Sequence, residues 1–66
     1  MIRIVDFYNQ VWFLNPNHII SVREFLPPYD EDLKGVKSAI QFGSGFVDEI
    51  YLDKTIDEVY KIIEKN

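Results

Sequence analysis

The sequence predicts a mainly β (α+β) domain, in which a small, bent antiparallel sheet of four or five strands is followed by one amphipathic C-terminal helix. Three observations predict this class. Short segments rich in β-branched and aromatic residues are typical of strands and cover 2–7, 11–14, 19–25, 36–42 and 46–52. Asn, Pro and Gly residues, which favour turns, separate these segments. Helical apolar spacing appears only after residue 55, and 66 residues allow a single domain over 1–66.

The first half of the chain predicts three strands. Residues 8–10 form a tight turn in which Asn9 is expected to adopt positive φ. Residues 11–14, Val-Trp-Phe-Leu, are apolar on both faces, which predicts a central strand, and Asn-Pro-Asn at 15–17 ends it. In the third strand, Ile20 and Val22 are expected to share one face.

The second half predicts a long loop and a hairpin. Residues 26–35 contain two prolines and an acidic run at 30–32, so a solvated loop is expected. Residues 36–42 alternate between apolar and polar side chains, and Gly-Ser-Gly at 43–45 supplies the positive φ of a hairpin turn. The alternation in 46–52 is imperfect, which predicts a bulge near residues 48–49.

The C-terminal helix has its own start signal. Thr55 and Glu58 form a capping box, in which each side chain can bond the other residue's backbone N–H. Acidic residues follow in the first turn and lysines come later, in agreement with the helix dipole. The apolar stripe expected to lie on the sheet consists of Ile56, Val59, Tyr60 and Ile63, widened by Ile62.

Composition excludes several classes of protein. The net charge is −4 and the seven basic residues are scattered, so nucleic-acid binding is not expected. No apolar run is long enough to predict a membrane span, and no signal peptide is expected. The absence of cysteine excludes disulfides and fits a cytoplasmic protein. Ten aromatic residues exceed what so small a core can hold, which favours a homo-oligomer.

The residues offer little reactive chemistry. Acyl transfer needs a nucleophile beside a base, but the chain has no cysteine, a single histidine, and serines in ordinary strand or turn positions. The acidic run lacks the ligand spacing of a calcium loop, and Gly43–Gly45 lacks the lysine or helix of a phosphate-binding loop. We therefore expect a protein that is not an enzyme and has neither cofactor nor metal.

Arginine beside surplus aromatic residues suggests a ligand site. In strands, arginines usually cover apolar surface or meet carboxylates, here Asp6, Glu24 or Glu49, yet they also bind planar anions. Capping of a strand is the simplest expectation for His18. The candidate ligand-binding residues are Arg3, Arg23, Trp12, Asn17, His18 and Tyr29.

Two functions follow. The first is a self-associating module that contacts a protein partner through apolar surface from Trp12, Phe25 and Tyr51. The alternative is a sequestering protein that holds a small anionic, nucleotide-like signal in pockets between subunits. There an arginine would neutralise phosphate, Trp12 or Tyr29 would stack on a base, and Asn17 or His18 would bond the sugar.

Three segments resemble the small flagellar proteins of the FlbD/SwrD type. Residues 13–22 are similar to their strand, Leu-Asn, turn, Ile, strand element. Residues 39–47 are similar to their glycine-containing hairpin, and 55–63 to their closing helix. The chain departs from them through residues 27–35. This resemblance implies a small non-enzymatic cytoplasmic protein and carries over no functional residues, and the size and aromatic content are also similar to phage accessory proteins. The expected bent sheet with its helix is similar to SH3 or Sm domains.

Overall fold

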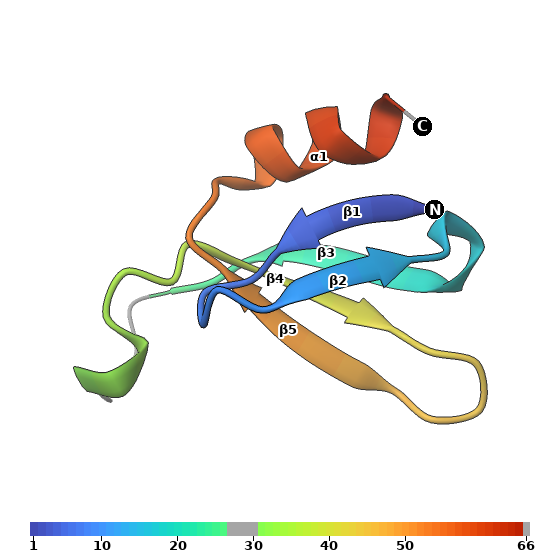
Figure 1. Ribbon diagram of the computed structural model, residues 1–66. Coiled ribbons are helices and arrows are strands. Elements are labelled where there is room, and N and C mark those ends of the chain that lie inside the picture. Colours follow the sequence, from blue (N-terminus) through green and yellow to red (C-terminus); the bar gives the residue numbers. More distant parts are fainter. Residues whose placement is uncertain (27–30, 66) are drawn as a thin grey trace.

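The computed structural model describes residues 1–26 and 31–65 and contains two antiparallel sheets (Figure 1). One sheet pairs β1 with β2, and the other has the order β3-β4-β5. The mainly β class with a C-terminal helix is confirmed, although the strands divide between two sheets instead of forming one bent sheet. The elements are β1 Ile2–Val5, β2 Val11–Leu14, the 3-10 helix η1 Pro16–His18, β3 Ile19–Glu24, the 3-10 helix η2 Glu31–Leu33, β4 Ser38–Phe42, β5 Asp48–Leu52 and α1 Ile56–Glu64.

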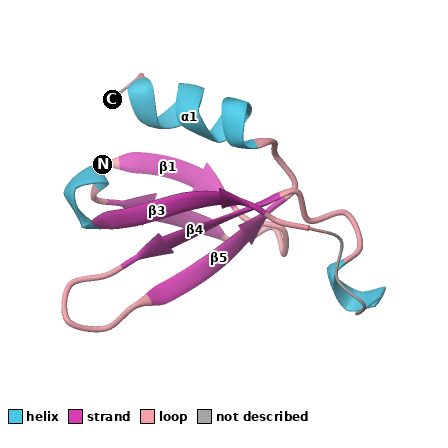
Figure 2. Cartoon of the chain, turned by 180° about the vertical axis from the view of Figure 1, so that it is seen from behind, coloured by secondary structure: helices cyan, strands magenta, loops and turns pink. Residues whose placement is uncertain are grey.

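The core lies where the two sheets and the helix meet. Figure 1 shows the β1–β2 hairpin in front of the three-stranded sheet, and Figure 2, from behind, shows the three-stranded sheet in front. Helix α1 runs along the top of both layers and contacts β1 and β3. Away from the helix, Phe7 N donates to Tyr51 O at 2.7 Å and ties the layers together. The buried cluster consists of Ile4, Leu14, Ile40, Ile50, Leu52 and Val59.

Strand β2 lies at an edge of its sheet, so the predicted central position of residues 11–14 is wrong. The strand pairs with β1 alone, in the register Ile4↔Trp12 and Val5↔Val11. One apolar face, with Leu14, covers the core, while Val11 and Phe13 on the other face are 49% and 62% exposed. Both faces are therefore apolar although only one is buried.

The β-bulge lies in β3 and not near residues 48–49, where it was predicted. The pairing of β3 with β4 shifts register between Ile19 and Ser21, whereas β5 pairs regularly with β4 from Asp48 to Leu52. Ile19 and Val22 both pack against the core although they are three residues apart. Strict alternation cannot place two residues with this spacing on one face, so the bulge adds one extra residue, Ile20, to β3. Ile20 is therefore exposed, and the prediction that it shares one face with Val22 is wrong.

The β4–β5 connection confirms the predicted glycine turn. Gly43 and Gly45 have φ of +152° and +101°. A Cβ on Gly43 would lie 1.7 Å from the carbonyl oxygen of Phe46, so the loop can pass this close to residue 43 only because that residue is glycine. Because β5 begins only at Asp48, Phe46 and Val47 belong to the loop and both are exposed.

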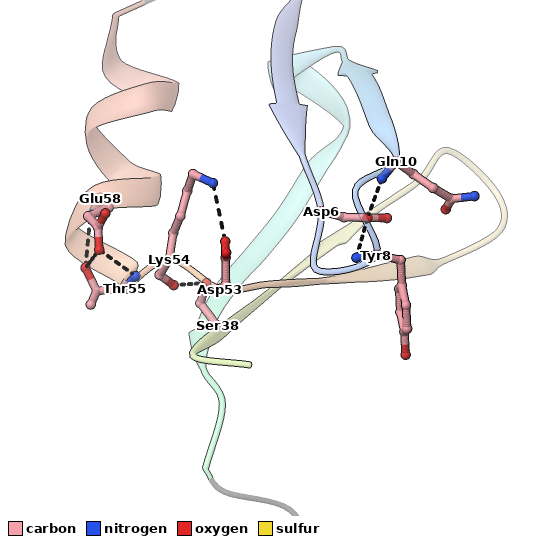
Figure 3. Close-up of polar contacts among 8 residues, drawn as sticks. All are labelled: Asp6, Tyr8, Gln10, Ser38, Asp53, Lys54, Thr55 and Glu58. Atoms are coloured by element: carbon pink, nitrogen blue, oxygen red, sulfur yellow. Dashed lines mark hydrogen bonds and ion pairs between the residues drawn. The ribbon is translucent and has the colours of Figure 1, made fainter. Parts of the chain in front are cut away.

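Helix α1 begins at the predicted capping box (Figure 3). Thr55 Oγ1 accepts from Glu58 N at 3.2 Å, and Glu58 Oε1 accepts from Thr55 N at 3.2 Å. Just before this cap, the buried Ser38 hydroxyl donates to Lys54 O at 2.6 Å and joins β4 to the helix entry.

The buried face of the helix differs from the predicted stripe. Val59 is buried and Ile62 and Ile63 pack against the core, but Ile56 and Tyr60 are exposed. The helix therefore buries the side centred on Val59 and turns its first apolar residue and its tyrosine outward.

Candidate functional site

An open groove lies at the end of the molecule where β2, η1 and the start of the β4–β5 loop meet. Figures 1 and 2 both show the chain start, η1 and this loop at the same end. The groove has a volume of about 330 Å³. The groove residues are Met1, Trp12, Phe13, Leu14, Asn15, His18, Phe42 and Gly43.

Trp12 is held in place from two sides. Its indole Nε1–H donates to Asp6 Oδ2 at 2.8 Å, and its ring meets the ring of Phe42 edge-to-face, with centroids 5.6 Å apart. A bonded donor and an aromatic contact together restrict both side-chain torsions of the tryptophan. The groove wall is therefore preorganised rather than formed by a mobile side chain.

Asp6 is the polar support of this wall. The residue is only 5% exposed, and its Oδ1 accepts from Tyr8 N at 2.8 Å and Gln10 N at 2.9 Å (Figure 3). Burial acts to raise the pKa of Asp6, and the hydrogen bonds from Trp12, Gln10 and Tyr8 act to lower it. The pKa lies below its ordinary value, so the carboxylate stays charged where Trp12 needs an acceptor.

Exposed apolar side chains occur both in the groove lining and in the loop that starts from it. Met1 and Phe13 are 74% and 62% exposed, and Phe46 and Val47 in the adjoining loop are 87% and 62% exposed. Gly43 lines the groove and lies beneath the Phe46 carbonyl, so the loop starts directly from the groove. Single exposed apolar residues are ordinary, but a group of them beside one groove is typical of an interaction surface.

The groove residues carry no Asp, Glu, Lys or Arg side chain, although 27% of the sequence is charged. The polar groups at its rim are Asn15 and His18. Asn15 Oδ1 accepts from the backbone N–H of Asn17 at 3.0 Å and caps η1. His18 was expected to cap the strand that follows it. Its backbone carbonyl accepts from Gly43 N at 2.9 Å, and this bond extends the pairing of β3 with β4 by one residue.

The structure brings together only part of the predicted ligand site. Trp12 and His18 share the groove, and Asn17 lies exposed in the adjoining η1. Arg3 is exposed on the outer face of β1, opposite Phe13, and makes no ion pair with the residues that the structure describes. Tyr29 lies outside the described residues.

Arg23 is engaged elsewhere, on the outer face of the three-stranded sheet. Its guanidinium binds both carboxylate oxygens of Glu49, with Nη2 at 3.1 Å from each, and lies 5.5 Å from the ring centroid of Phe25. Phe25 in turn meets Tyr51 edge-to-face at 5.2 Å. Of the two roles expected for a strand arginine, Arg23 therefore has the one of pairing with a carboxylate. Phe25 and Tyr51, which were expected at an interface, are half-buried in contacts within the chain.

Two further cavities are less suited to a ligand. One of about 530 Å³ lies near the helix entry, where its lining includes Glu24, Lys37 and Asp57 and the cap residue Thr55, which is already bonded. The other, of about 240 Å³, lies between β3 and α1. Mixed charges and a bonded polar group make the first unsuited to one kind of ligand, and the second is the smaller and is lined by only four residues.

Sequence reasoning missed several residues of this region. Phe13, Phe42 and Phe46 were not among the candidate residues, and Asp6 was considered only as a partner of arginine. The available signal for Asp6 was its position before a Tyr-Asn-Gln turn, where an aspartate readily accepts from the backbone two residues ahead. For Phe46, the signal was an aromatic residue directly after a Gly-Ser-Gly turn.

In the described ranges 1–26 and 31–65, no three His, Asp or Glu side chains converge as metal ligands. No helix in this part of the chain has the length and apolar character needed to cross a bilayer. The chain matches no protein-family model, no curated protein and no solved structure.

Proposed function

We propose that this chain is a non-catalytic binding module that contacts a protein partner through the groove between β2, η1 and the β4–β5 loop. The observation that supports the proposal is a groove lined by the exposed Phe13 and by a tryptophan fixed by Asp6, with the exposed Phe46 in the loop that starts from this groove. Aromatic anchors around a preorganised, uncharged centre are typical of the energetically dominant part of protein interfaces.

The groove fits an apolar anchor better than a small anion. Its volume of about 330 Å³ is at the low end for small-molecule sites, and it is open to solvent. Sequestration of a nucleotide-like signal, the alternative from the sequence, needs a cation at the site. Arg23 is instead neutralised by Glu49, and the groove residues include no lysine or arginine.

The chemistry expected of the partner is therefore a segment with one or two large apolar side chains. Such a segment can place an aromatic or aliphatic side chain against Trp12 and cover the exposed rings of Phe13 and Phe46.

We further propose a cytoplasmic location, because a chain without cysteine makes no use of an oxidising compartment.

A peptide-display selection on the immobilised protein tests this proposal. We expect enriched peptides to share an aromatic or aliphatic anchor. Their binding should fall by about tenfold or more in Phe46→Ser, as for the loss of an interface hot spot. Tyr60→Ser, which removes another exposed ring, on α1, is the control and should leave binding unchanged.

The selection can also reject the proposal. Failure to enrich any sequence family, or binding that is as strong in Phe46→Ser and Phe13→Ser as in the control, would assign the function to another surface. Circular dichroism of each variant checks that the fold is retained, which is expected because both phenylalanines are mostly exposed.

A further inference from the structure

The open edge of β2 has the composition of a strand that is paired on both sides. Its residues, Val-Trp-Phe-Leu, are all apolar, yet β2 has a neighbour only in β1. Native proteins usually protect a free edge with charges, proline, a bulge or a very short strand; β2 is short, with four residues, but it has no charge, proline or bulge. The missing neighbour is the feature to be explained.

The hydrogen-bonding geometry shows which groups face this edge. Asp6 N donates to Gln10 O at 2.9 Å, so these residues form a hydrogen-bonded pair at the turn. Because bonded pairs alternate along an antiparallel ladder, Trp12 and Leu14 direct their backbone groups toward β1. Val11 and Phe13 therefore direct theirs outward, and no described residue bonds to them.

We infer that the occupant of this edge is β2 of a second copy, paired antiparallel about a two-fold axis at Trp12. In this register Val11 of each copy lies opposite Phe13 of the other, and both outward amides of each strand gain a partner. The exposed side chains of Val11 and Phe13 then form cross-strand pairs, which stabilise antiparallel sheets. The two hairpins become one continuous four-stranded sheet.

Charge favours this edge over the other edges of the two sheets. The chain carries a net charge of −4, so any self-association has to avoid bringing carboxylates together. Pairing through β5 would bring Asp48 and Glu49 of two copies to one interface, whereas β1 and β3 are already contacted by α1. Strand β2 carries no charged residue, and its neighbours Gln10 and Asn15 are neutral.

Sedimentation of the wild-type chain and two lysine variants tests the inference. We expect the wild-type mass to rise from 7.8 kDa toward twice that value across the micromolar range. Val11→Lys puts a charge on the edge at a half-exposed position and should keep the chain monomeric. Val47→Lys, at another exposed valine, in the β4–β5 loop, is the control and should dimerise like the wild type.

Disulfide trapping tests the register. The chain has no cysteine, so any disulfide comes from the introduced residues. Directly paired residues have Cα atoms about 5.5 Å apart, within the range for a disulfide, whereas Val11 and its own copy would be too distant. Mixing Val11→Cys with Phe13→Cys under mild oxidation should therefore give mainly the mixed dimer.

Three results would overturn the inference: a wild-type chain that stays monomeric at high micromolar concentration, a dimer that survives Val11→Lys, or homodimers trapped as readily as the mixed dimer. The β2 edge and the groove share Phe13, but Phe46 belongs to the loop alone, so Phe46→Ser should lower peptide binding and leave dimerisation intact. Loss of dimerisation in Val47→Lys but not in Val11→Lys would place the interface at the loop instead, and would also reject the β2 edge.

Discussion

The Trp12 indole donates to the Asp6 carboxylate at 2.8 Å, across the hairpin that joins β1 to β2. The same carboxylate closes the turn by accepting from Tyr8 N and Gln10 N, so one side chain supports both the hairpin and the groove wall. A change at Asp6 is therefore expected to affect stability and binding together.

Replacing Asp6 by alanine should lower the free energy of unfolding by about 1–3 kcal/mol, because three donors lose their acceptor in part-buried hydrogen bonds. Urea denaturation followed by the fluorescence of Trp12, the single tryptophan, measures the change. Asp53→Ala is the control, because Asp53 is largely exposed and, among the described residues, its side chain bonds to Lys54 alone, at 3.4 Å; its cost should stay below about 0.5 kcal/mol. Equal effects of the two variants would show that the Asp6 carboxylate does not hold the hairpin.

Acid should remove the contribution of Asp6. Its folded-state pKa lies below the ordinary value of 3.8, so the unfolded chain takes up the proton first as pH falls. The stabilisation is complete above that value and disappears as pH drops through the lowered pKa. The stability difference between wild type and Asp6→Asn, measured by urea unfolding at successive pH values, should therefore shrink below about pH 4.

The comparison with Asp6→Asn is needed because the pKa of Glu58 is also lowered, so Glu58 too stabilises the fold less as the pH falls. Hydrogen bonds from the Thr55 backbone and hydroxyl lower the pKa of Glu58, so its helix cap also weakens in acid. That effect is common to both proteins and cancels in the difference. A difference that stays constant with pH would contradict the assignment to Asp6.

Gly43→Ala should destabilise the chain more than Gly45→Ala. Both glycines have positive φ, which costs an alanine about 1 kcal/mol. At Gly43 the new Cβ would also overlap the Phe46 carbonyl, whereas at Gly45 nothing lies within 4 Å. Thermal unfolding of the two variants measures the difference, and we expect Gly43→Ala to cost at least about 2 kcal/mol. Equal midpoints would mean that the loop relaxes freely away from residue 43.

Titration calorimetry with nucleoside phosphates and cyclic nucleotides should give no saturable heat. The groove residues offer no cationic side chain, and the Arg23 guanidinium already binds Glu49 through two oxygens. A saturable signal that disappears in Arg23→Gln would instead support nucleotide sequestration over the binding of an apolar peptide segment. Arg3→Gln provides the matched control, since Arg3 lies on the other sheet.

Local features of the fold could be predicted because neighbouring residues determine them. The capping box of Thr55 and Glu58 lies within one helical turn, and Asn9 has the expected positive φ, 64°. The edge position of β2 and the bulge at Ile20 depend on which surfaces meet in the core. An apolar tetrapeptide has the same composition at an edge and at the centre of a sheet, so its position could not be read from sequence.

The candidate site was predictable only in part for the same reason. Trp12 and His18 were identified as binding residues and do lie in one groove, because the turn between them is short. Arg23 meets Glu49 across 26 positions of sequence, through two strand pairings. Glu49 was one of three carboxylates that could equally have been its partner, and only the observed register identifies it.

The strand order has a consequence for folding kinetics. Each ladder joins strands that are consecutive in the chain, β1 with β2, β3 with β4 and β4 with β5. Pairing of neighbours requires little loop closure, so the two sheets can form early and separately. We therefore expect the packing of Ile4 and Leu14 from one sheet against Ile40 and Ile50 of the other, with Val59 of α1, to follow the formation of the sheets.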